Sequence, residues 1–197
     1  DVIQYARYAG RKIMELVEKN IRPRDIVTMA TLKNAITVDM ALGCSTNSML
    51  HLPAIAHEAG VELTLEDFDR ISRQVPFVCN LQPSGDYPIV SLDASGGIQA
   101  VLKTIETRLH KDVLTITGRP LGALLESIQA RPDQVLKSMD KPQKPEGGIA
   151  VLKGNLAPSG AVVKQSGVKP AMYHFRGKAR VFDSMEEADA AVSGGGI

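Results

Sequence analysis

The stretch Gly43-Cys44-Ser45-Thr46-Asn47 separates two apolar segments that are both predicted to be helices. Residues 32–42 carry apolar side chains on nearly every side, and residues 48–59 are also mostly apolar. Helices of this kind are expected to be buried. Gly43 suits the left-handed conformation that ends a helix, and the next helix can be capped by Ser45, Thr46 or Asn47. The pattern predicts backbone N–H groups beside hydroxyls and an amide, a combination that favours an anionic ligand.

The polar side chains of this stretch have two interpretations at the sequence level. Ser45, Thr46 and Asn47 either cap the second helix and do nothing more, or contact a carboxylate or phosphate. Cys44 is either a small buried hydrophobe or a ligand or nucleophile. Capping, and a packing role for Cys44, are the more frequent uses of such residues, and the sequence leaves the functional alternatives open.

Three other features near the stretch have a structural and a functional interpretation. Asp39 lies one turn before Gly43 on an apolar helix, so its carboxylate needs a partner, either a loop group or a ligand. His51 stands among apolar residues, and a core histidine is more frequent there than a catalytic one. Gly96-Gly97 precedes an amphipathic segment and is compatible with either a turn or an anion cradle.

Composition excludes several functional classes for this chain of 197 residues. Lys and Arg total 23 and Asp and Glu total 22, with no long run of either sign, and aromatic residues make up 4%. Neither a nucleic-acid surface nor an anionic-membrane surface is indicated, and no apolar run reaches the roughly 20 residues of a membrane span. The cysteines, Cys44 and Cys79, form no CxxC pair and are expected to be reduced thiols.

Periodicity and turn residues predict the other elements. Helices are expected over 2–16, 64–75 and 98–109, and after Pro120. Residues 76–97 are expected to be irregular. Strands are expected at 113–116, 149–152, 161–163 and 178–182, and Ser184 with Glu187 is expected to cap a last helix. Composition changes over residues 140–148, where Pro and Gly accumulate, which predicts a domain boundary.

The ordered set of motifs resembles the dihydroxy-acid dehydratase family, which also includes sugar-acid dehydratases such as 6-phosphogluconate dehydratase. The resemblance covers essentially the whole chain, and the block 147–158 is its most specific part. The matching residues are Asp39 to Asn47 (where the family usually has GGSTN), Leu50-His51-Leu52 through Ala56, Leu65 to Asp69 with Pro76, Pro83-Ser84-Gly85, Gly96-Gly97-Ile98, Thr115 to Gly118, Gly147 to Pro158, and Arg180 to Asp183. Cys44 in place of the second glycine raises the question of whether that position needs a positive φ. Pro53 stands where leucine is common.

The resemblance implies an α/β fold and an internal segment of a hydro-lyase. Residues 1–140 would form the helix-rich end of an α/β domain, and residues 141–197 would begin a β-rich, barrel-like C-terminal domain. Both ends of the chain, Asp1 and Gly194-Gly195-Gly196-Ile197, look cut from something longer. Family members convert 2,3-dihydroxy acids to 2-keto acids with an iron–sulfur cluster and a magnesium ion. The motifs carrying the cluster cysteines, the magnesium ligands and the base serine find no match in this sequence.

We therefore assign Ser45, Thr46 and Asn47 to substrate binding and expect no catalytic or metal-ligating residue in this chain, which alone should be inactive. The expected partner is a small dihydroxy acid, with neither nucleic acid nor membrane, in a cytoplasmic homodimer or dimer of dimers. Residues 164–168 favour the branched-chain amino-acid enzyme. The alternatives are a segment of a sugar-acid (aldonate or 6-phosphogluconate) dehydratase and a non-catalytic anion-binding or oligomerisation module.

Overall fold

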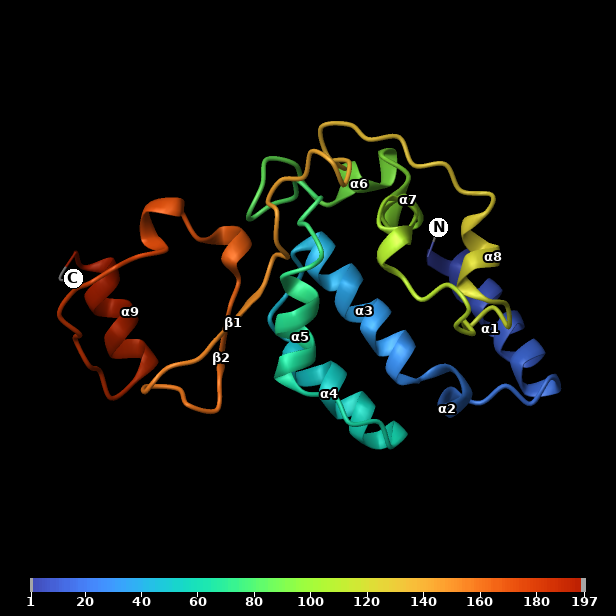
Figure 1. Ribbon diagram of the computed structural model, residues 1–197, viewed down its shortest axis with the longest axis horizontal. Coiled ribbons are helices and arrows are strands. Elements are labelled where there is room, and N and C mark those ends of the chain that lie inside the picture. The colour runs from blue at the N-terminus through green and yellow to red at the C-terminus, as the bar shows by residue number, and fades with distance from the viewer. Residues whose placement is uncertain (1, 196–197) are drawn as a thin grey trace. The chain divides into compact units, whose positions relative to one another are not determined.

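The computed structural model describes residues 2–195, so that Asp1, Gly196 and Ile197 lie outside the described part of the chain. The chain divides into two compact units, one ending at Gly167 and one beginning at Val168. We describe each unit by itself (Figure 1).

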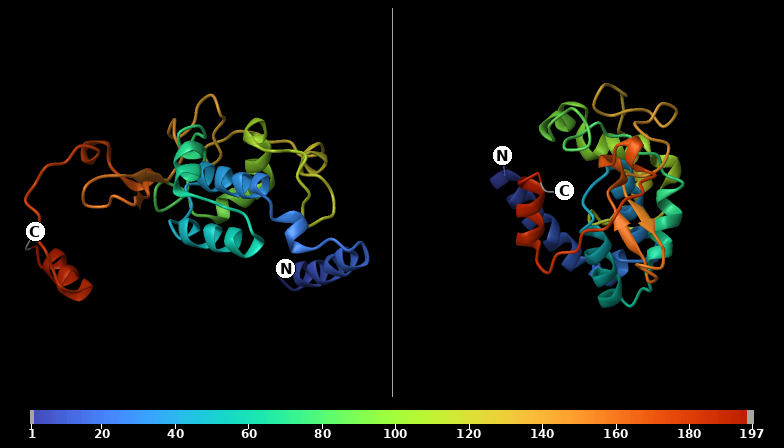
Figure 2. Two further views of the ribbon diagram at one scale, coloured as in Figure 1. Left: turned by 60° about the horizontal axis from the view of Figure 1, so that its bottom comes forward. Right: turned by 90° about the vertical axis from the view of Figure 1, so that its left-hand side faces the viewer.

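The first unit is mostly helical, with one small sheet. Its helices are α1 (Val2–Glu18), α2 (Pro23–Ile26), α3 (Met29–Leu42), α4 (Ser48–Ala59), α5 (Leu65–Ser72), α6 (Val90–Ala94), α7 (Gly97–Thr104) and α8 (Leu121–Leu125), with 3-10 turns at Glu106–Arg108 and Gln165–Gly167. Strands β1 (Ala150–Leu152) and β2 (Ala161–Val163) pair antiparallel, with Val151 opposite Val162, and Figure 2 shows them side by side. The two strands confirm the predictions for 149–152 and 161–163.

Helix α3 occupies the centre of this unit and contacts α4, α5 and α7. Ile36, Met40 and Ala41 are fully buried, as the apolar sequence predicted. The helix begins at Met29, and Thr28 before it is the N-cap. The Thr28 hydroxyl accepts the N–H of Thr31 at 3.3 Å, and the Thr28 N–H donates to the Thr31 hydroxyl at 2.8 Å. Reciprocal bonds of this kind satisfy donors that a helix start leaves open, so the chain enters the core at a fixed residue.

Helix α4 is less buried than its composition predicted. Only Met49 and Ala56 are buried in it, whereas Leu50 is 72% and Ile55 48% exposed. A proline inside a helix is expected to kink it or to delay its start, but α4 already begins at Ser48, five residues before Pro53. An apolar composition indicates that a helix packs against other polypeptide, but it does not indicate which. In this structure the described residues cover one face of α4.

An extended segment after α5, residues 75–81, is buried along its whole length. It pairs through isolated bridges, Phe77 with Lys144 and Cys79 with Leu136. The partner stretch, residues 136–145, contains Pro142 and Pro145, which lack the N–H that a continuous ladder requires. The prediction of an irregular segment over 76–97 therefore missed the extended core segment and also helix α6.

Two predicted strands are wrong. Residues 113–116 form a turn instead, with an isolated bridge between Leu114 and Pro120 and the Thr115 N–H donating to the Arg119 carbonyl at 3.0 Å. Residues 178–182 are not a strand either. A short apolar segment becomes a strand only when a partner edge is available, and the described residues offer neither segment such an edge.

The second unit contains a 3-10 turn, Pro170–Met172, and helix α9, Met185–Ser193. Ser184 caps α9 as predicted, since its hydroxyl accepts the N–H of Glu187 at 3.2 Å. None of its described residues is buried. The β-rich character expected after residue 140 is confirmed only as the β1–β2 pair. The barrel-like domain and the boundary between residues 140 and 141 stay predictions.

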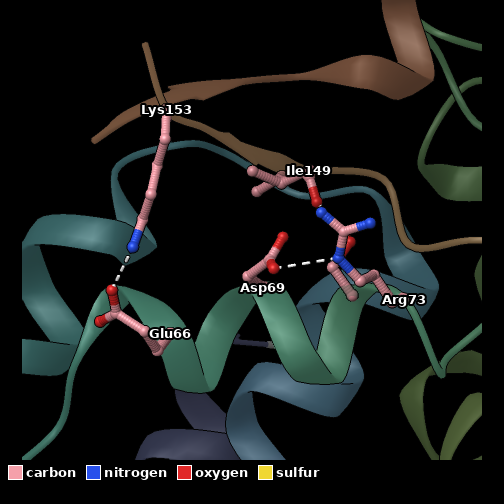
Figure 3. Close-up of polar contacts among 6 residues, drawn as sticks. Glu66, Asp69, Arg73, Ile149 and Lys153 are labelled. Carbon is pink, nitrogen blue, oxygen red and sulfur yellow. Dashed lines mark hydrogen bonds and ion pairs between the residues drawn. The ribbon is translucent and has the colours of Figure 1, made fainter. Parts of the chain in front are cut away.

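Helix α5 is joined to the segment 147–153, which contains β1, by a buried side-chain hydrogen bond of Ser72 and by one exposed ion pair. The Ser72 hydroxyl donates to the Ile149 carbonyl at 2.5 Å, in a buried position. Figure 3 shows Glu66, Asp69 and Arg73 along α5 below the segment 149–153. Lys153 bonds Glu66 at 2.5 Å with both side chains more than half exposed, and water and salt screen such pairs. The buried bond should therefore contribute most of the polar stabilisation.

We expect Ser72→Ala to lower the free energy of unfolding by about 1–3 kcal/mol, because the Ile149 carbonyl would lose its partner inside the core. Urea denaturation with equal m-values measures this. Glu66→Gln is the matched control and should leave the midpoint unchanged. Equal midpoints for Ser72→Ala and the wild type would contradict the assignment.

Candidate functional site

The loop of residues 43–47 joins α3 to α4. Gly43 ends α3 in the left-handed conformation (φ 63°, ψ 49°), as predicted, and its N–H donates to the Asp39 carbonyl at 3.0 Å. Among the described residues other than glycine, a positive φ occurs at Asn20 alone. Cys44 therefore sits in an ordinary conformation, and the loop does not require the second glycine of the family motif.

The N-cap position of helix α4 is Asn47, and no side chain caps the helix. Asn47 has helical angles, and its N–H donates to the Ser45 hydroxyl at 3.2 Å. The N–H groups of Ser48 and Met49 donate to the carbonyls of Ser45 (3.3 Å) and Thr46 (3.0 Å). The N–H groups of Asn47, Ser48 and Met49 are thus already paired within the loop and the first turn. A ligand at this helix start would meet side chains first.

The three predicted binding residues stand next to one another on the loop with different exposures. Ser45 and Asn47 are exposed, and Thr46 is partly buried. The cavity described along α4 lies toward the opposite end of the helix. It has a volume of about 380 Å³ and is lined by Pro23, Arg24, Val27, Ala54, Ile55, Glu58 and Ala59. Substrate binding by Ser45, Thr46 and Asn47 therefore stays a prediction.

Asp39 finds its partner in the loop. Its side chain is buried, and its Oδ2 accepts the Ser48 hydroxyl at 2.6 Å. Desolvation raises the pKa of Asp39, while hydrogen bonds from Ser48 and Cys44 and the charge of Lys164 act in the opposite direction. The need for a partner was predictable, but Ser48 was not singled out. Lys164 follows β2, and it comes near Asp39 only because the chain folds back on α3.

The end of α3 and the start of the loop pack directly against Gly147 and Gly148, the glycines that precede β1. The Gly148 N–H donates to the Met40 carbonyl at 2.9 Å, and the Gly147 N–H donates to the Ser72 carbonyl at 2.8 Å. A Cβ placed on Gly148 would lie 2.3 Å from the Cα of Gly43. The two backbones therefore touch, and the segment before β1 fixes the end of α3.

The histidines and the other glycine pair do not join this site. His51 is exposed, so the interpretation as a core histidine is wrong, because α4 turns that side away from the described core. Gly96 and Gly97 both have positive φ values, 97° and 64°. They form the turn between α6 and α7, and a Cβ on Gly96 would lie 2.8 Å from that of Ala100. The turn alone explains this pair.

The residues of this chain do not fit the iron–sulfur cluster or the magnesium ion that the resemblance implies. Between residues 2 and 195, no three His, Cys, Asp or Glu side chains gather as a metal site requires. Cys44 and Cys79 are free thiols, as expected, but Cys44 is exposed, so its interpretation as a small buried hydrophobe is wrong, whereas Cys79 is buried. Desolvation raises the pKa of Cys79 to about 12 and that of the more exposed Cys44 to about 11, whereas a cluster ligand is a thiolate. Neither thiol is therefore suited to hold a cluster.

No helix between Val2 and Gly195 is both long enough and apolar enough to cross a membrane.

Comparison with known proteins supports the resemblance seen in the motifs. Residues 1–124 match the model of the dihydroxy-acid/6-phosphogluconate dehydratase N-terminal domain, and residues 134–197 match the model of the C-terminal domain. The chain is 51% identical to a dihydroxy-acid dehydratase of Nitratidesulfovibrio vulgaris (strain DP4), with 99% of this chain and 36% of the relative covered. Dihydroxy-acid dehydratases of Solidesulfovibrio magneticus (52%) and Acetivibrio thermocellus (51%) match over the same shares of each chain. The chain thus spans about a third of the length of these relatives, and it belongs to the dihydroxy-acid/6-phosphogluconate dehydratase family.

Proposed function

We propose that the protein to which this chain belongs removes water from 2,3-dihydroxy acids to give 2-keto acids, in the biosynthesis of branched-chain amino acids. The observation that carries the proposal is the identity of about half of all residues, over nearly the whole chain, with proteins named dihydroxy-acid dehydratase. The name of those relatives specifies the reaction class, and we propose the same class for this protein.

In this proposal the chain contributes binding groups rather than the groups that break bonds. Ser45, Thr46 and Asn47 offer two hydroxyls and an amide, which can donate hydrogen bonds to the carboxylate and hydroxyls of a dihydroxy acid. The described residues near the loop form no pair of acid and base suited to proton transfer. Family cofactors, an iron–sulfur cluster and magnesium, would be held by other parts of a family-length protein, which we propose to be a cytoplasmic homodimer or dimer of dimers.

A full-length protein containing this chain is expected to form a keto acid from 2,3-dihydroxyisovalerate, detected as its hydrazone. The 197-residue chain alone should show no turnover, because its side chains do not fit the cofactors. Turnover by the isolated chain would contradict this division of roles.

The second candidate is a sugar-acid dehydratase, because the matching family model also covers 6-phosphogluconate dehydratase. Aldonates and 6-phosphogluconate should therefore be assayed beside the branched-chain substrate. Turnover of the sugar acids alone would overturn the first choice and establish the second.

A further inference from the structure

Asp39 holds both ends of the loop that carries the proposed binding residues. At the near end, its backbone carbonyl accepts the N–H groups of Gly43 (3.0 Å) and Cys44 (3.3 Å). At the far end, its side-chain Oδ2 accepts the hydroxyl of Ser48 at 2.6 Å. One residue of α3 therefore fixes where the loop begins and where α4 starts.

The carboxylate is costly in this position unless it is bonded. Asp39 is 6% exposed, and a buried charge without partners is strongly unfavourable. The groups that face it are Ser48 and Cys44 from the loop and Lys164 from the segment after β2. The other buried polar residues of α3 bond elsewhere: Asn34 to the backbone of His110 and Thr37 to the Lys33 carbonyl. Among these three buried polar side chains, Asp39 is therefore the one bonded to the loop.

The Ser48 hydroxyl lies within hydrogen-bond distance of two acceptors, and its bond to Asp39 is the one that links the loop to α3. Its oxygen lies 2.6 Å from the Asp39 carboxylate and 2.9 Å from the Ser45 carbonyl. A hydroxyl has one proton to donate, and bonds to charged acceptors are the shorter and stronger ones. Without the carboxylate, the proton would turn to the Ser45 carbonyl, and the loop would lose its link to α3.

We propose that Asp39 is a positioning residue for substrate binding, which holds Ser48 and thereby fixes the loop that presents Ser45, Thr46 and Asn47. The inference rests on the proposed function and extends it by a residue that does not itself touch the substrate. Hydroxyls and an amide on a loop recognise a dihydroxy acid only when they are held in one arrangement, because orientation determines much of the binding energy.

The first test compares substrate kinetics of full-length variants. Asp39→Asn keeps the shape of the side chain and removes its charge, and Ser48→Ala removes the donor. Both are expected to raise KM for 2,3-dihydroxyisovalerate about tenfold with little change in kcat, because binding groups are displaced while the reacting groups are not. The matched control is Asn34→Ala on the same helix. It also loses buried hydrogen bonds and should lower Tm while leaving KM unchanged.

The second test does not depend on activity. Alkylation of Cys44 by iodoacetamide, followed on the peptide that contains it, reports on the loop. Desolvation and Asp39 raise the pKa of Cys44 to about 11, so only a small fraction of this thiol is ionised at pH 8. The rate should rise about tenfold per pH unit up to about pH 10. Ser48→Ala, which breaks the contact with Asp39 but keeps its charge, should accelerate the reaction at pH 8, whereas Asn34→Ala should not.

The outcomes separate the two proposals. A wild-type protein without activity on any of the acids would overturn the proposed function, while the alkylation rates would still decide whether Asp39 orders the loop. An unchanged alkylation rate in Ser48→Ala would overturn the inference. So would a lowered Tm with unchanged KM in an active enzyme, since Asp39 would then be a structural residue alone.

Discussion

Replacing Gly148 with alanine is expected to lower the free energy of unfolding by about 3 kcal/mol, at the upper end of what forced overpacking costs. The added Cβ would lie 2.3 Å from the Cα and 3.2 Å from the backbone nitrogen of Gly43. These atoms belong to the main chain at the end of α3, where no rotamer change can relieve the contact. Gly148 also donates to Met40 and accepts from Ser166 through its backbone, so it cannot move away without losing both bonds. Denaturation by urea, monitored by circular dichroism, measures the loss.

Gly154→Ala is the matched control for this prediction. A Cβ on Gly154 meets nothing within 4 Å, and its φ is not in the left-handed region. Alanine there should change the free energy of unfolding by less than about 0.5 kcal/mol. Similar midpoints for the two variants would mean that the contact between Gly148 and Gly43 does not constrain the folded protein.

Gly43→Ala should cost a similar amount, about 3 kcal/mol, for two separable reasons. The left-handed conformation at φ 63° costs a residue with a Cβ about 1–2 kcal/mol. The new Cβ would also lie 2.5 Å from the ring of Phe77, a fully packed core residue that has little room to move. Both effects act on the folded state, and the same denaturation experiment measures their sum.

Gly60→Ala separates the two reasons. Gly60 ends α4 in the same conformation, with φ 75° and no atom within 4 Å of an added Cβ. It should therefore show the conformational cost alone. In a double-mutant cycle, Gly43→Ala made in a Phe77→Leu background should cost nearly as little as Gly60→Ala. An undiminished cost in that background would place the strain elsewhere than at Phe77.

Local signals predicted the parts of the fold that depend on neighbours in sequence. The ends of α3 and α4 follow from Gly43 and Gly60, and the start of α9 follows from Ser184. Capping acts over three or four residues, so its pattern is complete within a short stretch. The partner requirement of Asp39 was predictable for a related reason, because a carboxylate on an apolar helix cannot stay unbonded.

The failures concern contacts between distant segments. Residues 178–182 have the alternation of a strand but no edge to join among the described residues. His51 lies in an apolar stretch, yet it is exposed because composition does not say which face of α4 the core covers. The contact of Gly148 with Gly43 and the charge of Lys164 near Asp39 belong to the same class. Both contacts bring the region after residue 140 to the candidate site, and no pattern in the local sequence predicts either of them.

The touching backbones of Gly43 and Gly148 also set an order of events during synthesis. The two glycines lie 105 positions apart in the chain, and translation proceeds at about 5–20 residues per second. Roughly 5–20 seconds therefore pass between the emergence of the loop and the arrival of the segment that secures it. Until then, the loop between α3 and α4 lacks its contact with Gly148 while the chain is still on the ribosome. Nascent chains stalled before residue 148 should therefore be cut by protease within this loop.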